Sequence, residues 1–186
     1  MQLTALSSTS FGQLTAEDIR RMQADGLIDE DDNFELIEGR IVPMGPKYHA
    51  HERLKSELGM ALARVCPTDL IVGFETSLFL GRDTIVEPDL CVYSRELRSE
   101  DVRGNDVLLA IEIASSTLAL DRGPKARLYA GYNVRELWVI DTNTRTTWIH
   151  RNAAAGERQE IVEVGSKETL RFGAIPAFTV RLDQFN

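Results

Sequence analysis

The sequence predicts a mixed α/β (α+β) fold in which helices flank a mixed β-sheet. Two apolar runs, Val107–Ile111 and Leu137–Ile140, are typical of strands buried on both faces. One clear helix has apolar side chains at helical spacing from His51 to Val65, and Cys66-Pro67 ends it. Helices and strands alternate without a Gly-rich phosphate loop, which argues against a nucleotide-binding doubly wound fold.

The first part of the chain predicts a helix followed by a β-hairpin. Thr15 is a typical N-cap for a short helix that ends near Gly26. Phe34–Glu38 and Arg40–Met44 flank Gly39 and have the pattern of two paired strands.

Strand-like segments separated by polar turns follow the central helix. They cover residues 70–80, 84–93, 107–112, 136–141, 146–150, 160–164, 170–172 and 178–182. We expect a further helix to begin at Pro124, because the fixed φ of proline suits the first helical turn. The hairpin and the last strands are therefore additions at the two ends of a central sheet.

Length and composition are those of an ordinary globular protein. The chain has 186 residues, of which 43% are hydrophobic and 27% charged. Residues 1–13 are rich in Ser and Thr without periodicity, so we expect a flexible N-terminus there and a single domain over residues 14–186. No apolar run approaches the roughly 20 residues of a membrane span, and the N-terminus lacks a signal-peptide pattern. We therefore expect a cytoplasmic protein that has no membrane partner.

The charge balance bears on nucleic-acid binding. Lys and Arg total 21 against 29 acids, so the net charge is −8, which argues against indiscriminate coating of nucleic acid. A nucleic-acid enzyme is not excluded, because charges more than about 8 Å apart are largely screened at physiological salt. A sequence-specific transcription factor is disfavoured, because no helix concentrates basic residues.

Two predicted strands each carry an acid. Glu112 ends an apolar run, and Asp89 directly follows Pro88. A buried carboxylate without partners costs several kcal/mol, so Glu112 needs solvent, a cationic partner or a metal ion. Lys125, in the following helix, could reach the strand ends. Asp, Glu and Lys on neighbouring elements are the parts needed to hold a divalent cation beside a phosphate.

Several stretches, taken in order, resemble a known family. They are Phe34–Gly39, His51, Pro88-Asp89, Ile111–Thr117, Asp121–Tyr129 and Glu136–Asp141. The ordered set resembles the PD-(D/E)XK nuclease superfamily and, more closely, the Uma-two family of restriction-endonuclease-like proteins, formerly a domain of unknown function. The resemblance covers about residues 14–150 and implies a restriction-endonuclease-like fold.

The resemblance also implies a metal-dependent DNA endonuclease. Asp89, Glu112 and the backbone carbonyl of Ile113 would coordinate Mg²⁺ or Mn²⁺, and Lys125 would orient the attacking water or stabilise the transition state. The superfamily's Glu-X-Lys pattern would place its lysine at position 114, which is Ala114 here. In the Uma-two pattern the lysine has moved to the next helix, where Lys125 fits.

Other residues are candidates of a second rank. Glu35 is the polar member of an alternating strand, so it either completes the acidic cluster or pairs with an arginine. His51 could contact a phosphate or the nucleophilic water, or simply cap or pack at its helix start. A zinc site at His49-X-His51 has no further histidine or cysteine nearby to complete it. Asp121 could pair with Lys125 four residues later and orient it.

Alternatives remain open at this point. Glu112 and Lys125 could form a structural ion pair with Asp89 facing solvent. A catalytically silent binding or scaffold module would fit the negative net charge and the absent strand lysine. A homodimer is expected because double-strand cleavage needs two sites, and Phe178 and Phe185, which look exposed in the sequence, could form its interface. Arg122, Arg127 and Lys47 are candidates for phosphate contacts.

Overall fold

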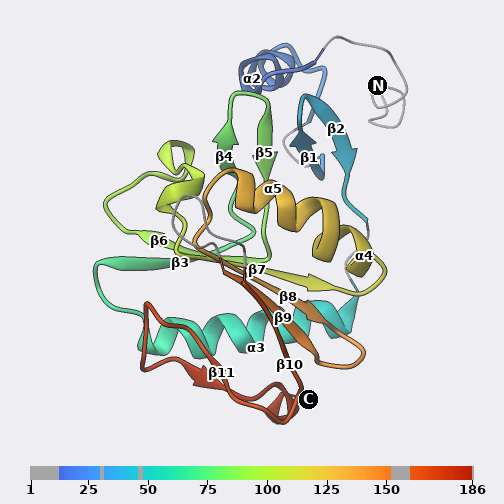
Figure 1. The fold of residues 1–186 in the computed structure, drawn as a ribbon. Helices are drawn as coiled ribbons and strands as arrows, with labels where there is room; N and C mark the ends of the chain where they lie inside the picture. Colours follow the sequence, from blue (N-terminus) through green and yellow to red (C-terminus); the bar gives the residue numbers. More distant parts are fainter. Residues whose placement is uncertain (1–12, 30–31, 46–47, 152–159, 186) are drawn as a thin grey trace.

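The computed structural model describes residues 13–29, 32–45, 48–151 and 160–185 (Figure 1). The expected flexible segment, residues 1–13, lies outside these ranges apart from Gln13, as does Lys47. No helix in the described ranges is long and apolar enough to cross a membrane. The predicted mixed sheet with flanking helices is confirmed.

The main sheet has six strands in the order β10-β9-β8-β7-β6-β3. Its strands are β3 (Leu70–Phe74), β6 (Leu90–Ser94), β7 (Leu109–Ala114), β8 (Glu136–Asp141), β9 (Thr147–Arg151) and β10 (Glu160–Val164). β7 and β8 are parallel, and the other neighbouring pairs are antiparallel. The helical connection between β7 and β8 permits this parallel pairing.

A second, four-stranded sheet has the order β2-β1-β5-β4. Its strands are β1 (Phe34–Ile37), β2 (Arg40–Pro43), β4 (Leu78–Gly81) and β5 (Thr84–Val86). The predicted hairpin of β1 and β2 is confirmed, and Gly39 takes a positive φ of 77° in its turn. Helix α2 (Ala16–Ala24) contributes Ile19 to a small core with Leu36 and Ile41 of the hairpin.

Two segments expected as single strands are each divided between the sheets. Residues 70–80 form β3 and β4, and residues 84–93 form β5 and β6. Glu75 adopts a left-handed φ of 46°, which no continuous strand accommodates. Pro88 has no N–H to donate to a sheet, so the second strand breaks there. Asp89 consequently stands directly before β6 and not within a strand.

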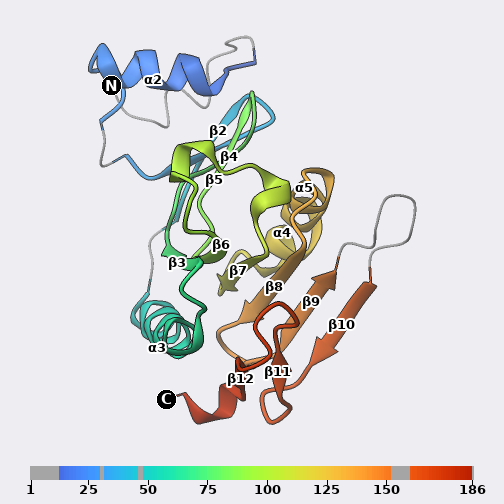
Figure 2. The ribbon, with the colours of Figure 1, turned by 90° about the vertical axis from the view of Figure 1, so that its left-hand side faces the viewer.

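Helices cover both faces of the main sheet. Helix α3 (His49–Val65) packs Leu54, Leu58 and Leu62 against one face. The other face is covered by α4 (Leu118–Leu120), a π-helical segment (Asp121–Lys125) and α5 (Ala126–Gly131). Figures 1 and 2 show α3 on one side of the sheet and α4 and α5 on the other. Three short 3-10 turns complete the described helices: Ser99–Asp101, Gly104–Asp106 and Leu182–Gln184.

The helix expected to start at Pro124 begins earlier. It starts at Leu118, and Pro124 lies inside the π-helical segment. Proline cannot donate an i→i−4 hydrogen bond, and its ring clashes with the carbonyl that would accept one. A local widening to π geometry is one way a helix accommodates such a residue.

The side chains of β7 alternate between the two faces of the sheet. Ile111 and Ile113 join the core under α3, whereas Ala110 and Ala114 join the core under α5. Glu112 therefore faces α5 from between two alanines. Small neighbours leave room for a larger polar group above the sheet.

The C-terminal strands are β11 (Leu170–Arg171) and β12 (Thr179–Val180), which pair with each other. Phe178 is buried, and its ring stacks on Trp138 with the centroids 6.0 Å apart. Phe185 packs partly buried against the same core. The expectation that Phe178 is exposed is therefore wrong, because the C-terminal strands pack it against the sheet beside α3, whereas Phe185 keeps part of its surface exposed.

Candidate active site

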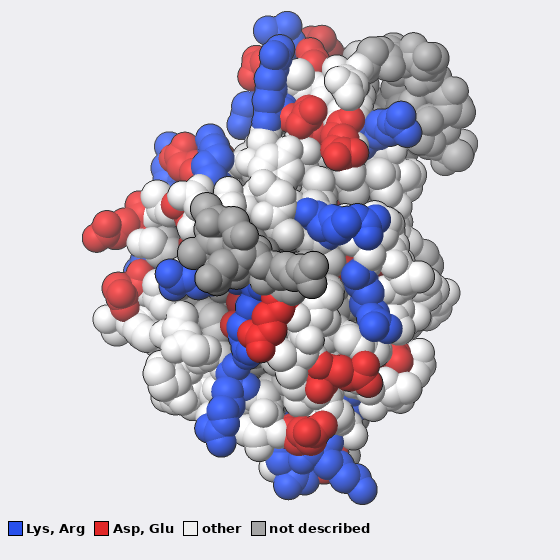
Figure 3. Space-filling model, viewed as in Figure 1, with Lys and Arg blue, Asp and Glu red and all other residues white. Residues whose placement is uncertain are grey.

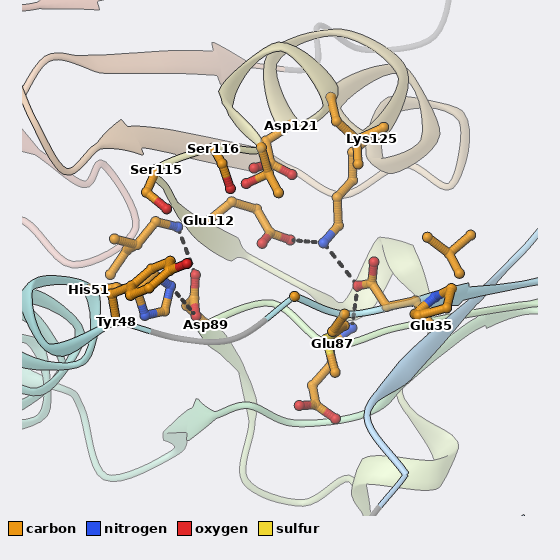
Figure 4. A pocket seen from close by; sticks show the side chains of 17 residues that line it. Glu35, Tyr48, His51, Glu87, Asp89, Glu112, Ser115, Ser116, Asp121 and Lys125 are labelled. Atoms are coloured by element: carbon orange, nitrogen blue, oxygen red, sulfur yellow. Dashed lines mark hydrogen bonds and ion pairs between the residues drawn. The ribbon is translucent and has the colours of Figure 1, made fainter. Parts of the chain in front are cut away.

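The candidate residues meet in one pocket of about 170 Å³ between the two sheets. Glu35 comes from β1, Glu112 from β7 and Lys125 from the π-helical segment, while Asp89 precedes β6 and His51 lies in the first turn of α3. Figure 4 shows these side chains converging from elements that are far apart in the sequence. Ile113 also lines the pocket.

Lys125 links two acids. Its Nζ lies 2.9 Å from Glu35 Oε1 and 3.0 Å from Glu112 Oε1. All three side chains are buried. Burial lowers the pKa of Lys125, but the charges of Glu112 and Glu35 outweigh it and raise the pKa well above its usual value. The lysine is therefore a permanent positive charge. Glu35 is held in turn by the backbone N–H of Glu87, which donates to Oε1 at 2.9 Å.

Glu112 has the opposite electrostatic balance. Burial and the negative charges of Glu35, Asp89 and Asp121 outweigh the attraction of Lys125, so the pKa of Glu112 is raised. The hydroxyl of Tyr129 donates a hydrogen bond of 2.6 Å to Glu112 Oε1.

The contact of Tyr129 is a finding that sequence reasoning misses. The sequence around Tyr129 predicts a core residue, and the Tyr129 side chain is indeed buried. The available signal is its position four residues after Lys125, which places both on one helix face.

Asp89 is anchored to the strand that carries Glu112. Its Oδ2 accepts a 2.7 Å hydrogen bond from the backbone N–H of Ile113, and its Oδ1 lies 3.1 Å from His51 Nε2. Asp89 is 7% exposed, so the alternative in which it faces solvent is wrong. The ion pair of Glu112 and Lys125 that the same alternative invokes is present.

His51 continues a chain of polar contacts along α3. Its Nδ1 lies 3.2 Å from Glu52 Oε1, and Glu52 Oε2 lies 2.8 Å from Nζ of the buried Lys55. Burial lowers the pKa of His51, but its contacts with Asp89 and Glu52 outweigh burial and raise it. Sequence reasoning gives no role to Lys55, which also pairs with Glu75 at 2.5 Å.

The remaining candidates divide into two groups. Asp121 is buried and lines the pocket, and burial raises its pKa although Thr117 and Lys125 oppose the shift. The guanidinium of Arg122 stacks instead on the ring of Trp148, 3.6 Å from the centroid. Arg127 lines a neighbouring hollow beside α5.

Comparison with known proteins places the chain in a family. The Uma2 (Uma-two) family model, described as "Putative restriction endonuclease", matches residues 16–183. The chain belongs to the Uma2 family. The match extends past residue 150, so the C-terminal strands are part of the family's fold.

A solved structure supports this fold for the Uma2 chain. It is a crystal structure of a "putative nuclease belonging to DUF820" from Anabaena variabilis ATCC 29413, with a TM-score of 0.71 and 15% sequence identity. The superposition covers 92% of this chain and 97% of the Anabaena chain. At this identity the similarity establishes the fold alone. No curated protein matches the sequence.

The pocket of this Uma2 protein also accounts for the absent strand lysine. Ala114 is fully buried in the core under α5, so position 114 supplies packing. The positive charge comes from Lys125, one helix later, and reaches the carboxylate of Glu112 at 3.0 Å.

The donor chemistry of the pocket suits a hard divalent cation. Its lining offers carboxylate oxygens and a single histidine, which is the donor set of Mg²⁺ or Mn²⁺ and not that of structural zinc. Within the described ranges, no three His, Cys, Asp or Glu side chains are grouped to hold a metal. A cation here would thus take at most two of these side chains, with backbone oxygen and water completing the shell, as Mg²⁺ commonly does.

Proposed function

We propose that this Uma2 protein is an endonuclease that hydrolyses DNA phosphodiester bonds with Mg²⁺ or Mn²⁺. The observation that carries the proposal is the ammonium of Lys125, held between Glu35 and Glu112 in the pocket that Asp89 also lines. Family membership supports the general class of nuclease. DNA and the metal are our additions.

Asp89, Glu112 and the carbonyl of Ile113 are the proposed ligands of the cation. When bound, the cation would supply Lewis acidity toward the phosphate and a more acidic bound water. Asp89 is oriented for this task by the N–H of Ile113 and by His51, so it needs little rearrangement. The positive charge of a bound cation would also oppose the burial and the repulsion between acids that raise the pKa of Glu112.

Lys125 is the proposed electrostatic catalyst. Its charge is permanent, and it lies where negative charge would develop on a phosphate that enters beside Glu112. Glu35 would position Lys125 through the 2.9 Å contact. His51 would hold Asp89 at the other end of the pocket.

Buried charge favours catalysis over a purely structural role. Glu35, Asp89, Glu112 and Asp121 are all buried in one pocket with a single buried lysine among them. Apolar residues of similar size usually stabilise a fold at least as well as buried ion pairs do. A silent scaffold would therefore gain nothing in stability from this cluster.

A plasmid nicking assay tests the proposal. Wild-type protein with Mg²⁺ or Mn²⁺ should nick supercoiled DNA, and Asp89→Asn and Lys125→Met should each lose at least about 100-fold in rate, as removal of one electrostatic catalytic group typically does. Asp25→Asn, an exposed change at the end of α2, serves as the matched control and should retain full activity.

Two results would argue against the nuclease. Equal nicking by wild type and Asp89→Asn would assign the activity to a contaminant. Absence of nicking, together with absence of Mn²⁺ binding in calorimetry, would favour the catalytically silent binding or scaffold module.

The cellular setting and the oligomeric state are further proposals. We place the protein in the cytoplasm, where a DNA substrate is accessible. We also propose a homodimer, because cutting both strands of a locally unpaired region would need two sites, and light scattering of the purified protein tests it. A monomer would instead fit cleavage of one strand at a time.

A further inference from the structure

We propose that the substrate is single-stranded or locally unpaired DNA, and that Tyr48 stacks on a base next to the scissile phosphate. The inference rests on the proposed nuclease function and specifies its substrate class. It comes from the contrast between the floor of the pocket, which is charged and recessed, and its rim, which carries exposed apolar side chains and no exposed cation among the described residues.

The floor lies too deep for a rigid duplex. Glu112, Asp89 and Lys125 are 5%, 7% and 7% exposed, so the reacting phosphate must enter the pocket to reach them. Duplex DNA is stiff over about 150 base pairs, and bending it sharply costs several kcal/mol. A single strand can direct one phosphate into a narrow opening at much lower cost.

The rim is partly apolar and includes an exposed aromatic ring. Tyr48 is 62% exposed and Leu120 is 40% exposed, and both line the pocket. Val42 and Pro43 of β2 and the next residue, Met44, add further apolar surface, while Ser116 and Thr117 add exposed hydroxyls. Tyr48 is the N-cap of α3, one helical turn before His51, and its side chain makes no capping hydrogen bond. Figure 4 shows Tyr48 at the end of the pocket where His51 and Asp89 lie.

This rim is complementary to free bases. A duplex presents sugars and phosphates to a protein and hides the faces of its bases. The apolar part of the rim would then face the charged phosphates of the duplex. A single strand exposes the faces of its bases, and each base stacked on an aromatic side chain contributes about 1–3 kcal/mol. An exposed tyrosine beside the reacting groups offers such a platform.

The charge of the pocket and its surroundings also gives duplex DNA little electrostatic attraction. Among the described residues, five acids line the pocket: Glu35, Glu87, Asp89, Glu112 and Asp121. The described lining residues include one lysine, Lys125, and no arginine. Figure 3 shows acidic and basic side chains interspersed on the face it presents, without an extended basic field. Duplex DNA, with one charge per roughly 1.7 Å, depends on such basic surfaces. Stacking supplies affinity that does not need them.

The test measures binding and cleavage separately. Fluorescence anisotropy, with Ca²⁺ in place of Mn²⁺, compares a labelled single-stranded oligonucleotide with the same sequence as a duplex, and a gel assay with Mn²⁺ compares their cleavage. We expect the single strand to be bound and cleaved at least about tenfold better. Tyr48→Ala should weaken single-strand binding about tenfold, and Tyr48→Trp should restore it.

Ile161→Ala is the matched control, because Ile161 is 57% exposed on β10 and is not among the pocket residues. Equal thermal midpoints for the variants would establish that they fold. Preference for the duplex, or binding that is unchanged by Tyr48→Ala, would overturn the inference and leave the nuclease standing. Tyr48-dependent single-strand binding without any cleavage would support Tyr48 as the base-stacking residue but overturn the nuclease, and with it a cleaved substrate. Absence of binding to either DNA, with no cleavage, would overturn both.

Discussion

Glu112 is buried between Ala110 and Ala114, and its described polar contacts are those with Lys125 and Tyr129. An isolated carboxylate in such a position costs several kcal/mol. One ammonium does not offset burial and three neighbouring acids, which is why the pKa of Glu112 is raised. At the scale of single residues, ionisation of Glu112 is therefore unfavourable in this pocket, and a bound cation would favour it.

The hydroxyl of Tyr129 should matter more than an ordinary tyrosine hydroxyl. Tyr129→Phe removes a 2.6 Å hydrogen bond to a buried carboxylate and should lower the free energy of unfolding by about 1.5–3 kcal/mol. Urea unfolding at pH 9, above the raised pKa of Glu112 and so with the carboxylate charged, measures this loss.

Tyr132→Phe is the control for this change. Tyr132 donates a 3.0 Å hydrogen bond to the neutral hydroxyl of Thr84 and has only a long 3.5 Å contact with Asp83 Oδ1, so the loss of its hydroxyl should cost about 0.5–1.5 kcal/mol. Equal losses in the two variants would mean that the short hydrogen bond of Tyr129 to Glu112 stabilises the fold no more than the longer contacts of Tyr132 do.

At the scale of elements, the interrupted helix over β7 positions the basic group. Asp121 and Lys125 are the two ends of the π-helical segment, and both side chains are buried in the pocket. Single π turns inside α-helices occur frequently at functional sites. The segment continues into α5, which packs Ala126 and Tyr129 on the sheet and so anchors the lysine.

The turn at Gly104 packs closely against Tyr132 at the C-terminal end of α5. A substitution at Gly104 tests whether this contact constrains α5. A Cβ at position 104 would lie 2.0 Å from the carbonyl oxygen of Tyr132, a backbone atom that cannot rotate away. Gly104→Ala should therefore lower the free energy of unfolding by about 1–3 kcal/mol and reduce DNA cleavage, because the end of α5 must move.

Gly131→Ala provides the comparison for this variant. Position 131, the last residue of α5, has nothing within 4 Å of an added Cβ, so stability should stay the same or rise slightly. A thermal midpoint of Gly104→Ala that equals that of Gly131→Ala would show that the contact with Tyr132 does not constrain α5.

At the scale of the whole molecule, the buried acid makes stability depend on pH. The pKa of Glu112 is raised from 4.5 to about 8, so the folded protein binds this proton more tightly than the unfolded chain does. The contribution to stability is present below pH 4.5 and is lost as the pH rises toward 8. The raised pKa of His51 acts in the same direction from pH 6.5 upward.

With EDTA present, the wild-type thermal midpoint should therefore fall between pH 5 and pH 8, and Glu112→Gln should fall less steeply. One proton accounts for at most about 1.4 kcal/mol per pH unit. Mn²⁺ should raise the wild-type midpoint most at the alkaline end, where it competes with fewer protons. Differential scanning calorimetry measures both effects. If the thermal midpoints of wild type and Glu112→Gln changed equally with pH, the result would contradict a raised pKa at Glu112.

Much of the architecture can be predicted from local pattern. The hairpin around Gly39, helix α3 and the buried strands β7 and β8 follow from turn residues and from apolar periodicity. The strand breaks at Glu75 and Pro88 are not predicted by local pattern. They arise because β3 and β4, and likewise β5 and β6, join different sheets.

The sequence by itself determined the types of group in the pocket and the elements that carry them. A carboxylate that follows a buried apolar run and a lysine in the next helix are local facts of the chain, and the energetic cost of burying charge implies that they must find partners. Tertiary structure alone decided which partners those are. Glu35 meets Lys125, Asp89 meets the N–H of Ile113, and Tyr48 stands at the rim, because packing two sheets and two helical layers sets distances between residues that sequence spacing does not encode.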